Sequence, residues 1–196
     1  MMVVRSPYRE FVMAMERVEQ RLRKVTAALD SAGIPYAVIG GNAVASWVAR
    51  FKPSATRTTK DVDLLVRRQD LTGITDTLSH LQFERHDLRR LVIFVDPEEP
   101  ERECGVHLVW AGEKVRTTYS EPAPSVEESV TAPDGFRVLS LPALVRMKLT
   151  SFRDIDRVHV ADLLRVGLID DAVTDSLPKE LRERLAAVEA SLDTDE

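Results

Sequence analysis

The chain has 196 residues, of which 44% are hydrophobic and 30% are charged, as in an ordinary globular protein. The net charge of -5 argues against a protein that coats nucleic acid non-specifically. No apolar run approaches the ~20 residues that a membrane helix needs, and "MMVVRSPYREF" becomes charged too soon for a secretory signal. The single cysteine, Cys104, excludes an internal disulfide, so we expect a cytoplasmic protein with no membrane partner.

The first part of the chain predicts alternating helices and strands. Ser6 and Asn42 are N-cap residues that would begin two of the helices. Apolar residues of the first helix recur three and four positions apart, at Phe11, Met15, Val18, Leu22 and Val25. In chain order the predicted elements are a helix (6–32), a buried strand (35–41), a helix (42–51), a strand (61–66) and a helix (68–81).

The second part predicts more strands and then helices only. An acidic turn, "PEEPERE" (97–103), joins two strands, and a "PDG" turn precedes a short strand. Ser176 is the expected N-cap of the last helix, and the tail "DTDE" (193–196) is expected to fray. The predicted elements are strands at 89–97, 104–112 and 136–140, and helices at 141–168 and 176–192.

This order of elements predicts the fold class α/β (α+β), a small mixed sheet flanked by helices, with a helical C-terminal part. We expect residues 1–140 to form the α/β core. Residues 141–196 would add helices that close a cleft, the two parts forming one compact unit.

Two acids begin the strand in "ATRTTKDVDLLV" (55–66). Asp61 and Asp63 are two positions apart, so in a strand their side chains point to the same face. Two carboxylates at that distance repel each other unless a cation lies between them. The segment "RFKPSATRTTK" (50–60) leads into the pair and carries four basic residues and no acid. The pair predicts either a divalent metal site or two solvated acids at the start of a strand.

Gly40 and Gly41 lie where the first strand meets the next helix. Glycines at such a point let a ligand approach the backbone. The N-terminus of the following helix offers free N–H groups and a positive dipole, both of which suit a phosphate. A tight strand-to-helix turn is the alternative explanation.

The chain resembles the nucleotidyltransferase superfamily, which has the DNA polymerase β-like fold. The resemblance lies in Gly40 and Gly41 after a strand, the helix that follows them, and the motif "T-x-D-V-D-L-L-V" (59–66). Within it, the AbiEii-type toxins and minimal nucleotidyltransferases are most similar. The resemblance covers roughly residues 20–165 and includes "VLSLPALVRMKLTSFRDIDRVHVADLL" (138–164). It implies transfer of a nucleoside monophosphate from a nucleoside triphosphate to a hydroxyl of a tRNA end, a protein or a small molecule. An antitoxin protein is an implied partner.

The same resemblance implies roles for individual residues. Asp61 and Asp63 would hold Mg²⁺ or Mn²⁺, and Lys148 would neutralise charge on the triphosphate. Asp61, Asp63 and Lys148, together with His107, form the expected catalytic set. The expected nucleotide-binding residues are Gly40, Gly41, Asn42, Arg57, Thr59, Lys60, Lys148 and Asp162.

The third acid of this family is the main departure. The family places another carboxylate on a neighbouring strand, and here that position holds His107. Histidine acts as a base near neutral pH or binds a softer metal than Mg²⁺. Glu103 or Asp96 would replace it if the strand register shifted, and a half-buried strand histidine is the alternative. A chain that has lost the third acid could also be a non-catalytic protein that binds a nucleotide or a partner.

Asp156, His159 and Asp162 are three positions apart in a predicted helix and therefore share one face. That face would form the wall of the nucleotide site or an ion-paired surface with Arg153 and Arg157. No cysteine joins this group, which excludes a structural zinc site.

Overall fold

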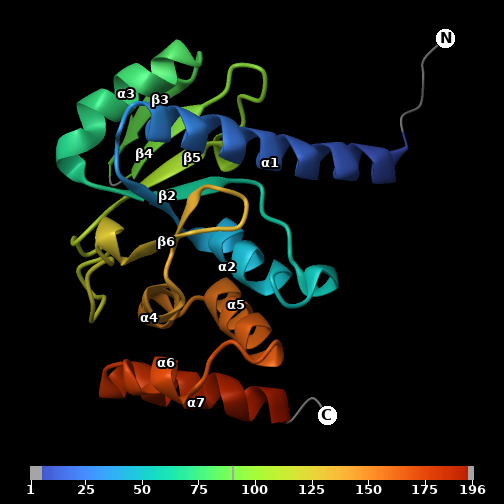
Figure 1. Ribbon diagram of the computed structural model, residues 1–196, viewed down its shortest axis with the longest axis vertical. Coiled ribbons are helices and arrows are strands. Elements are labelled where there is room, and N and C mark those ends of the chain that lie inside the picture. Colours follow the sequence, from blue (N-terminus) through green and yellow to red (C-terminus); the bar gives the residue numbers. More distant parts are fainter. Residues whose placement is uncertain (1–5, 90, 194–196) are drawn as a thin grey trace.

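The computed structural model describes residues 6–89 and 91–193 and shows one seven-stranded mixed sheet with helices packed on it (Figure 1). The strands are β1 (Tyr36–Val38), β2 (Val62–Val66), β3 (Glu84–Leu88), β4 (Leu91–Val95), β5 (Val106–Trp110), β6 (Ser129–Thr131) and β7 (Arg137–Leu139). The α-helices are α1 (Pro7–Ser31), α2 (Gly40–Ala49), α3 (Leu71–His80), α4 (Leu141–Ser151), α5 (Asp154–Arg165), α6 (Asp171–Asp175) and α7 (Lys179–Asp193). The predicted fold class is confirmed.

The sheet order is β3-β4-β5-β2-β1-β7-β6, so β2 lies at its centre. β2 pairs antiparallel with β1 and parallel with β5. In the second ladder Asp63 lies opposite His107. The apolar residues of β2 are fully buried, as expected for a strand covered on both faces (Val62, Leu64, Leu65 and Val66).

Helices cover both sides of the sheet. Figure 1 shows α1 and α3 on one side, and α2, α4 and α5 on the other. α7 packs against α4 and α5 and is the outermost layer. One hydrophobic cluster runs from α1 through the sheet to Leu181, Leu185 and Val188 of α7. No helix among the described residues is long and apolar enough to cross a membrane.

The predicted N-cap of α2 is wrong. The helix begins at Gly40, two residues earlier than expected, and Ile39 is its N-cap. Asn42 therefore lies in the first turn, where its side-chain amide donates a hydrogen bond of 2.7 Å to the backbone carbonyl of Asp61. The Asn42 side chain therefore does not cap α2 but links this helix to the start of β2.

The predicted helix at 141–168 is two helices. Phe152 adopts the left-handed conformation (φ 46°) and ends α4, and α5 begins after Arg153. Ser176 is the C-cap of α6, a short helix that was not predicted, and does not cap α7. Neither glycine nor proline marks the break at Phe152, and the sign that the local sequence does carry is the pair of acids in the first turn of α5, Asp154 and Asp156.

Two strands were not predicted. β3 is an edge strand of mostly exposed polar residues, so it lacks the apolar alternation that marks a strand. β6 has three residues and forms the hairpin partner of β7. The expected fraying of the tail concerns residues that lie, apart from Asp193, outside the described part of the chain.

The apolar stripe of α1 is only half buried. Leu22 and Val25 belong to the core, whereas Phe11 and Met15 are 53% and 39% exposed. Figure 1 shows the reason: the N-terminal half of α1 extends beyond the sheet that its C-terminal half covers. A regular apolar spacing thus predicts the helix correctly but not where its packing partner ends.

Candidate metal and nucleotide site

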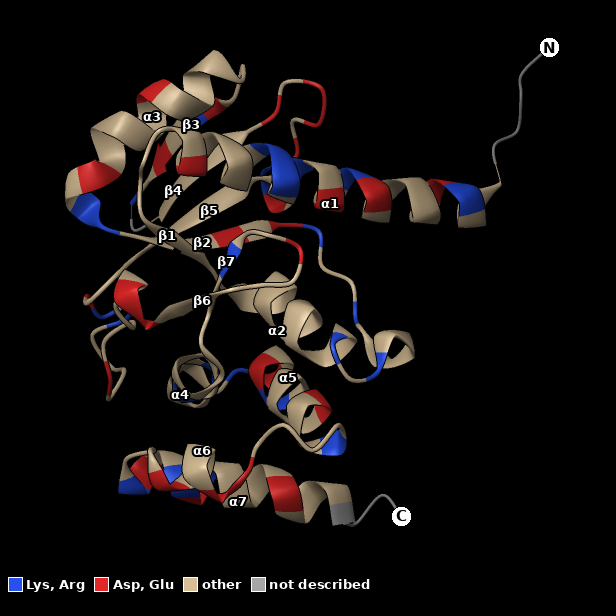
Figure 2. Ribbon diagram, in the orientation of Figure 1, with Lys and Arg blue, Asp and Glu red and all other residues tan. Residues whose placement is uncertain are grey.

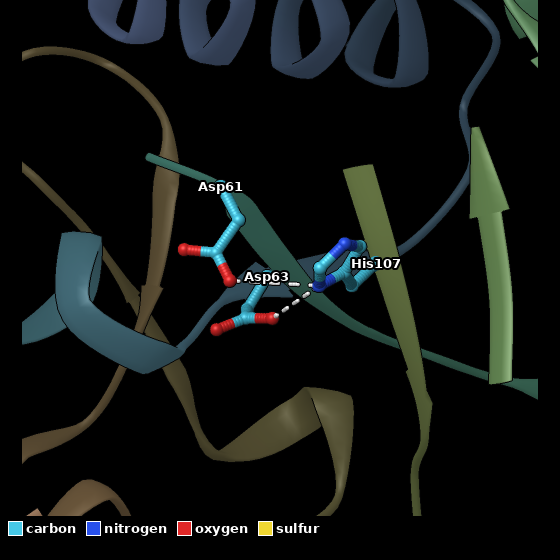
Figure 3. A group of neighbouring side chains, drawn as sticks. All are labelled: Asp61, Asp63 and His107. Carbon is cyan, nitrogen blue, oxygen red and sulfur yellow. Dashed lines mark ion pairs between the residues drawn. The ribbon is translucent and has the colours of Figure 1, made fainter. Parts of the chain in front are cut away.

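Asp61, Asp63 and His107 form one cluster at the centre of the sheet (Figure 3). One ligand atom from each lies within 4.8 Å of the others. His107 Nδ1 is 3.5 Å from Asp61 Oδ2 and 3.6 Å from Asp63 Oδ1. Asp61 immediately precedes β2, Asp63 lies on it, and His107 lies on the parallel neighbour β5. The two acids and the histidine predicted for the third position are therefore brought together.

The ring orientation of His107 is set by the backbone. Its Nε2 lies 2.8 Å from the carbonyl oxygen of Arg102, which can only accept a hydrogen bond, so Nε2 carries the proton. Nδ1 is then the atom that faces the carboxylates. Burial lowers the pKa of His107, but the carboxylate of Asp63, the carbonyl of Arg102 and the charge of Asp61 together raise that pKa above its ordinary value.

The donor set fits a divalent cation. Two carboxylates and an imidazole that donates its other N–H to a carbonyl oxygen form a common arrangement around protein-bound metals. Atoms that each lie about 2.1 Å from one ion are about 3–4 Å apart, and Nδ1 lies 3.5 and 3.6 Å from the two carboxylate oxygens. Asp61 and Asp63 are thus suited to the metal role that was predicted for them.

Gly40 is required by the position of Asp63. Its φ is +65°, and a Cβ atom at this residue would lie 2.0 Å from Asp63 Oδ2. Gly41 faces Thr59, whose Cβ would be 3.0 Å from a Cβ on Gly41. Both glycines therefore make room for the side chains that shape the site, and the N-terminus of α2 lies directly beside the carboxylates.

Two further contacts hold Asp61. The hydroxyl of Thr59 donates a hydrogen bond of 2.5 Å to Asp61 Oδ1, and Asn42 holds the Asp61 carbonyl. Thr59 lies at the edge of the cluster, whereas Lys60 is exposed and only its backbone carbonyl is engaged, by Arg21. Of these predicted nucleotide-binding residues, Thr59 and Asn42 contact Asp61 and so help to position the cluster of Asp61, Asp63 and His107 in the described structure.

A cavity of about 490 Å³ opens over the cluster, a volume in the usual range for a small-molecule site. Its floor contains the glycine pair, Asp61, Asp63 and His107. The opposite wall comes from α4 and α5, and the segment after β5 forms a third side, with Val115, Arg116, Tyr119, Glu121 and Pro122. Elements far apart in the sequence therefore meet around one space.

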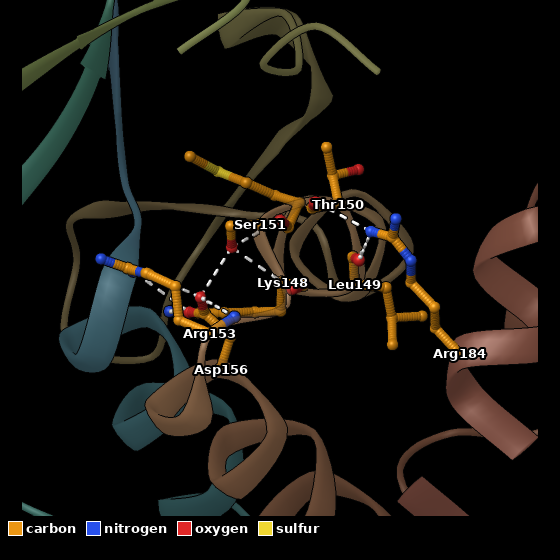
Figure 4. Close-up of polar contacts among 8 residues, drawn as sticks. Lys148, Leu149, Thr150, Ser151, Arg153, Asp156 and Arg184 are labelled. Atoms are coloured by element: carbon orange, nitrogen blue, oxygen red, sulfur yellow. Dashed lines mark hydrogen bonds and ion pairs between the residues drawn. The ribbon is translucent and has the colours of Figure 1, made fainter. Parts of the chain in front are cut away.

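Lys148 reaches this cavity from α4 but is already paired (Figure 4). Its Nζ lies 3.1 Å from Oδ1 of Asp156, which is fully buried. Arg153 and Ser151 also donate hydrogen bonds to Asp156. Burial opposes ionisation of Asp156, but Arg153, Lys148 and Ser151 outweigh it and hold the pKa of that carboxyl below its ordinary value. Two cations thus share one carboxylate, which leaves one net positive charge on this wall.

Arg153 was predicted only as a surface ion-pair partner, but it lines the cavity and 57% of its side chain is exposed. Of the two cations that contact Asp156, Arg153 is the exposed one, because Lys148 is buried. Because Arg153 follows the unpredicted break between α4 and α5, the apolar periodicity of this region carries no sign of its position.

His159 lies deeper in the same wall. It is 8% exposed, and its Nδ1 has no hydrogen-bond partner among the described residues. Burial, and then the charge of Lys148, lower the pKa of His159 to about 4. The ring is therefore neutral near pH 7 and presents an unsatisfied nitrogen beside the cavity. Of the predicted face of Asp156, His159 and Asp162, the first two form the wall of the site.

Arg57 and Asp162 lie outside the cavity. Arg57 Nε donates a hydrogen bond of 2.5 Å to Asp162 Oδ2, and Arg165 also contacts that carboxylate. This pair fastens the connection between α2 and β2, whose Lys and Arg residues are blue in Figure 2, to α5. In the described structure both residues are engaged with each other and do not face the metal cluster.

The two substitutes considered for the third acid are also elsewhere. Glu103 is exposed in a short 3₁₀ turn before β5. Asp96 accepts a hydrogen bond of 3.0 Å from the backbone of Glu98 in the acidic turn. That turn, drawn in red in Figure 2, is tied to α1 through Glu99, which pairs with Arg17 and Arg21. His107 therefore occupies the third position without a shift of register.

No family model matches the sequence, and no curated protein matches it. Among solved structures, the chain is similar to ANT(2'')-Ia in its crystal structure with adenylyl-2''-tobramycin. The TM-score is 0.50 and the identity 15%, over 90% of this chain and 99% of that chain. The solution structure of the antibiotic-resistance factor ANT(2'')-Ia gives a TM-score of 0.49 at 15% identity, over 90% and 84% of the two chains.

JHP933 from Helicobacter pylori is similar at a TM-score of 0.43 and 14% identity, over 95% of each chain. At sequence identities of 14–15%, similarity to a solved structure is evidence of a shared fold only. ANT(2'')-Ia is a nucleotidyltransferase, and the similarity to its crystal structure extends over 90% of this chain. The chain therefore has the nucleotidyltransferase fold that its glycine pair and Asp-x-Asp strand implied.

Proposed function

We propose that this protein transfers a nucleoside monophosphate from a nucleoside triphosphate to an acceptor hydroxyl, with Mg²⁺ or Mn²⁺ as the metal. The observation that carries the proposal is the meeting of Asp61, Asp63 and His107 beside the N-terminus of α2, at the floor of one cavity. A metal centre and a phosphate-binding helix terminus at one point are what a bound nucleoside triphosphate needs.

In the proposed reaction the acceptor oxygen attacks the α-phosphorus, and the bond from that phosphorus to the bridging oxygen breaks. Pyrophosphate leaves, and the hydroxyl proton passes to a base or to water. A metal bound at the cluster would stabilise the charge on the reacting phosphate.

The chain's own groups have separate parts. The α2 N-terminus would bind phosphate through backbone N–H groups. Arg153 would meet the triphosphate charge, while Lys148 holds Asp156 and so keeps Arg153 in place.

The acceptor is a hydroxyl on a tRNA end, a protein or a small molecule. The neighbouring structure of ANT(2'')-Ia is a complex with adenylyl-2''-tobramycin, which supports a small-molecule acceptor for this fold. Incubation with labelled nucleoside triphosphates and either total tRNA, cell lysate or aminoglycosides separates the three classes. Label in RNA, in protein or in a small molecule identifies the acceptor.

The proposal is tested with Asp61→Asn and Asp63→Asn together. Both side chains lie at the cavity and are only partly buried, so the variant should keep its fold while transfer is lost. Circular dichroism checks the fold, and release of pyrophosphate measures the reaction. Full activity of a folded double variant would refute the assignment of these ligands.

A second function follows from the histidine itself. If the third carboxylate is indispensable, the chain binds a nucleotide or a partner protein without turnover. Under this alternative, His107→Asp should create pyrophosphate release from a silent background. Release by the wild-type protein would exclude the binding-only function.

A toxin-like role with an antitoxin partner is part of the proposal, in line with the AbiEii-type resemblance. It requires that expression of the wild-type chain stops growth and that the Asp61→Asn, Asp63→Asn variant does not. Equal toxicity of both would exclude nucleotidyl transfer as the cause.

A further inference from the structure

The third position of the metal cluster offers a nitrogen where a carboxylate would offer oxygen. His107 Nδ1 faces both carboxylates, at 3.5 Å from Asp61 Oδ2 and 3.6 Å from Asp63 Oδ1. The opposite ring nitrogen is held by the carbonyl of Arg102, a residue outside the cluster. The ring therefore cannot turn Nδ1 away from the acids without losing that hydrogen bond.

We infer that His107 Nδ1 is the third ligand of the metal, and that the site prefers Mn²⁺ over Mg²⁺. The inference rests on the metal site of the proposed function but not on transfer itself. It assigns a direct role to His107 and selects between the two metals that the paired aspartates alone leave open.

The preference follows from the donor set. Mg²⁺ favours oxygen ligands and gives up its water reluctantly, whereas imidazole suits transition-metal ions. An imidazole in place of a third carboxylate also removes one negative charge from the site. This loss should weaken the binding of Mg²⁺ more than that of Mn²⁺, because Mg²⁺ gains less from a nitrogen ligand. Mn²⁺ shares with Mg²⁺ a preference for carboxylate and water oxygens, but it is a transition-metal ion and accepts an imidazole nitrogen more readily. Of the two metals it is therefore the one that can use all three side chains.

The backbone makes this ligand set a fixed feature of the fold. Asp63 and His107 are direct partners in the parallel β2–β5 ladder, so their spacing is set by the sheet. Gly40 leaves room for the Asp63 carboxylate, and Thr59 orients that of Asp61. Each of the three ligands therefore has its own support, as preorganised metal sites require.

One consequence concerns the reaction. A ring whose Nδ1 binds a metal and whose Nε2–H is held by a carbonyl has no free lone pair. His107 is then a metal ligand and not the base that receives the acceptor proton.

The first experiment measures metal binding to the full chain without nucleotide. The protein is stripped with a chelator and titrated with Mn²⁺, and the electron paramagnetic resonance signal of free Mn²⁺ reports binding. Mg²⁺ is then added as competitor. We expect Mn²⁺ to bind at least about tenfold more tightly than Mg²⁺. His107→Ala should lose at least about 10–100-fold in Mn²⁺ affinity, because removing a direct ligand should cost no less than removing an outer contact to a ligand. It should change Mg²⁺ affinity much less.

The second experiment identifies the ligand atom. Pulsed electron paramagnetic resonance of the Mn²⁺ complex detects coupling to a directly bound nitrogen. The coupling should be present in the wild type and absent in His107→Ala and His107→Asn. His107→Asn keeps a polar planar group near the position of Nδ1 and leaves less empty space than alanine, so it guards against a folding defect. His80→Ala, which removes an exposed histidine on α3, is the matched control and should keep the signal.

His107→Asp tests the selectivity separately. A third carboxylate should raise Mg²⁺ affinity and reduce the ratio of Mn²⁺ to Mg²⁺ affinity. Absence of nitrogen coupling in the wild type, or unchanged Mn²⁺ affinity in folded His107→Ala, would overturn the inference. Equal competition by Mg²⁺ would overturn the preference. Because binding is measured without nucleotide, a protein that binds Mn²⁺ through nitrogen but transfers nothing refutes only the proposed function.

Discussion

At the scale of single residues, Gly40 leaves space for the Asp63 carboxylate because it has no side chain. It combines a left-handed backbone with the close approach of Asp63. The first property would cost any other residue roughly 1–2 kcal/mol. The second concerns only this position, because no other described left-handed glycine faces a carboxylate.

Gly40→Ala is expected to disturb the metal cluster beyond its effect on stability. The new methyl group would have to displace the Asp63 carboxylate, so Mn²⁺ affinity should fall at least about tenfold. Gly33→Ala is the matched control, since Gly33 has the same φ of +65° and nothing lies within 4 Å of the point where its methyl group would stand. Urea unfolding should show a loss of about 1–2 kcal/mol in Gly33→Ala from the backbone alone. The loss in Gly40→Ala should be larger, because its methyl group also overlaps the Asp63 side chain. Equal metal binding by the two variants would contradict the role of Gly40.

His159 makes the folded protein sensitive to acid. Its pKa falls from 6.5 in the unfolded chain to about 4, chiefly because of burial and then Lys148. The unfolded state therefore binds the proton more readily. The stabilisation from this group is complete above pH 6.5 and is lost as the pH falls toward 4.

Between pH 7 and about 4.5, His159 should remove about 2 kcal/mol from the free energy of unfolding. The variant His159→Gln should lack this part of the pH dependence, and His80→Ala should keep it. Urea unfolding of the three proteins at about pH 7, 5.5 and 4.5 makes the comparison. The pKa of His107 shifts in the opposite direction, so only the difference between wild type and His159→Gln isolates the effect. Parallel pH profiles for those two proteins would exclude it.

At the scale of elements, the junction of α4 and α5 is held by charge rather than by a helical pattern. The chain turns at Phe152, and Asp156 of α5 reaches back to Lys148 of α4 and to Arg153 at the junction. Asp156 is fully buried, so removing its charge leaves Lys148 without a partner in the interior.

Asp156→Asn should lower the free energy of unfolding by about 3–5 kcal/mol, the usual cost of breaking a buried ion pair from one side. Asp154→Asn is the matched control on the same helix. The Asp154 carboxylate is 94% exposed and pairs with Arg157 at the surface, so its loss should have a small effect. Chemical unfolding at neutral pH decides the matter, and equal stability of the two variants would rule out a structural role for the buried pair.

The same junction shows how far sequence patterns reach. Apolar periodicity predicts α1, α3, β2, β4 and β5 because each buries one regular face or run. It does not predict the end of α4 at Phe152, where neither glycine nor proline is present and Asp156 forms ion pairs across the junction. It also does not predict β3, because an exposed strand at the edge of the sheet has no buried apolar face. Both features depend on contacts between residues far apart in the chain, and a local sequence pattern does not contain such contacts.

The site divides in a similar way. Asp61, Asp63 and the glycine pair are close in sequence and match the family resemblance, so they could be predicted. His107 was found because it occupies the position where that resemblance places a third acid. Arg153 could not, because its place depends on the break between α4 and α5. Arg57 and Asp162 have suitable chemistry for a phosphate, but the fold engages them with each other.

At the scale of the whole molecule, the C-terminal helices are joined to the sheet by one core. Leu185 of α7 is almost fully buried, and Arg184 donates hydrogen bonds to the carbonyls of Leu149 and Thr150 at the end of α4. We therefore propose that 1–140 and 141–196 unfold together, as one unit.

Leu185→Ala should lower stability by about 2–5 kcal/mol. Trp47 on α2 and Trp110 on β5 report from the N-terminal part, so their fluorescence should follow the weakened transition. Glu183→Ala, which changes an exposed side chain on α7, is the control. A fluorescence transition that stays at the wild-type urea concentration in Leu185→Ala would show that the two parts unfold independently.

The pairing of Asp63 with His107 has a consequence for how such a protein can change over generations. The ladder is formed by backbone atoms, so position 107 faces the aspartates whichever side chain it carries. Codons for histidine and aspartate differ only in their first base. A single base change therefore exchanges an imidazole for a carboxylate at the centre of the sheet and leaves the backbone pairing intact. With His107 as the third ligand that we infer, one reversible mutational step would change the metal preference of this site.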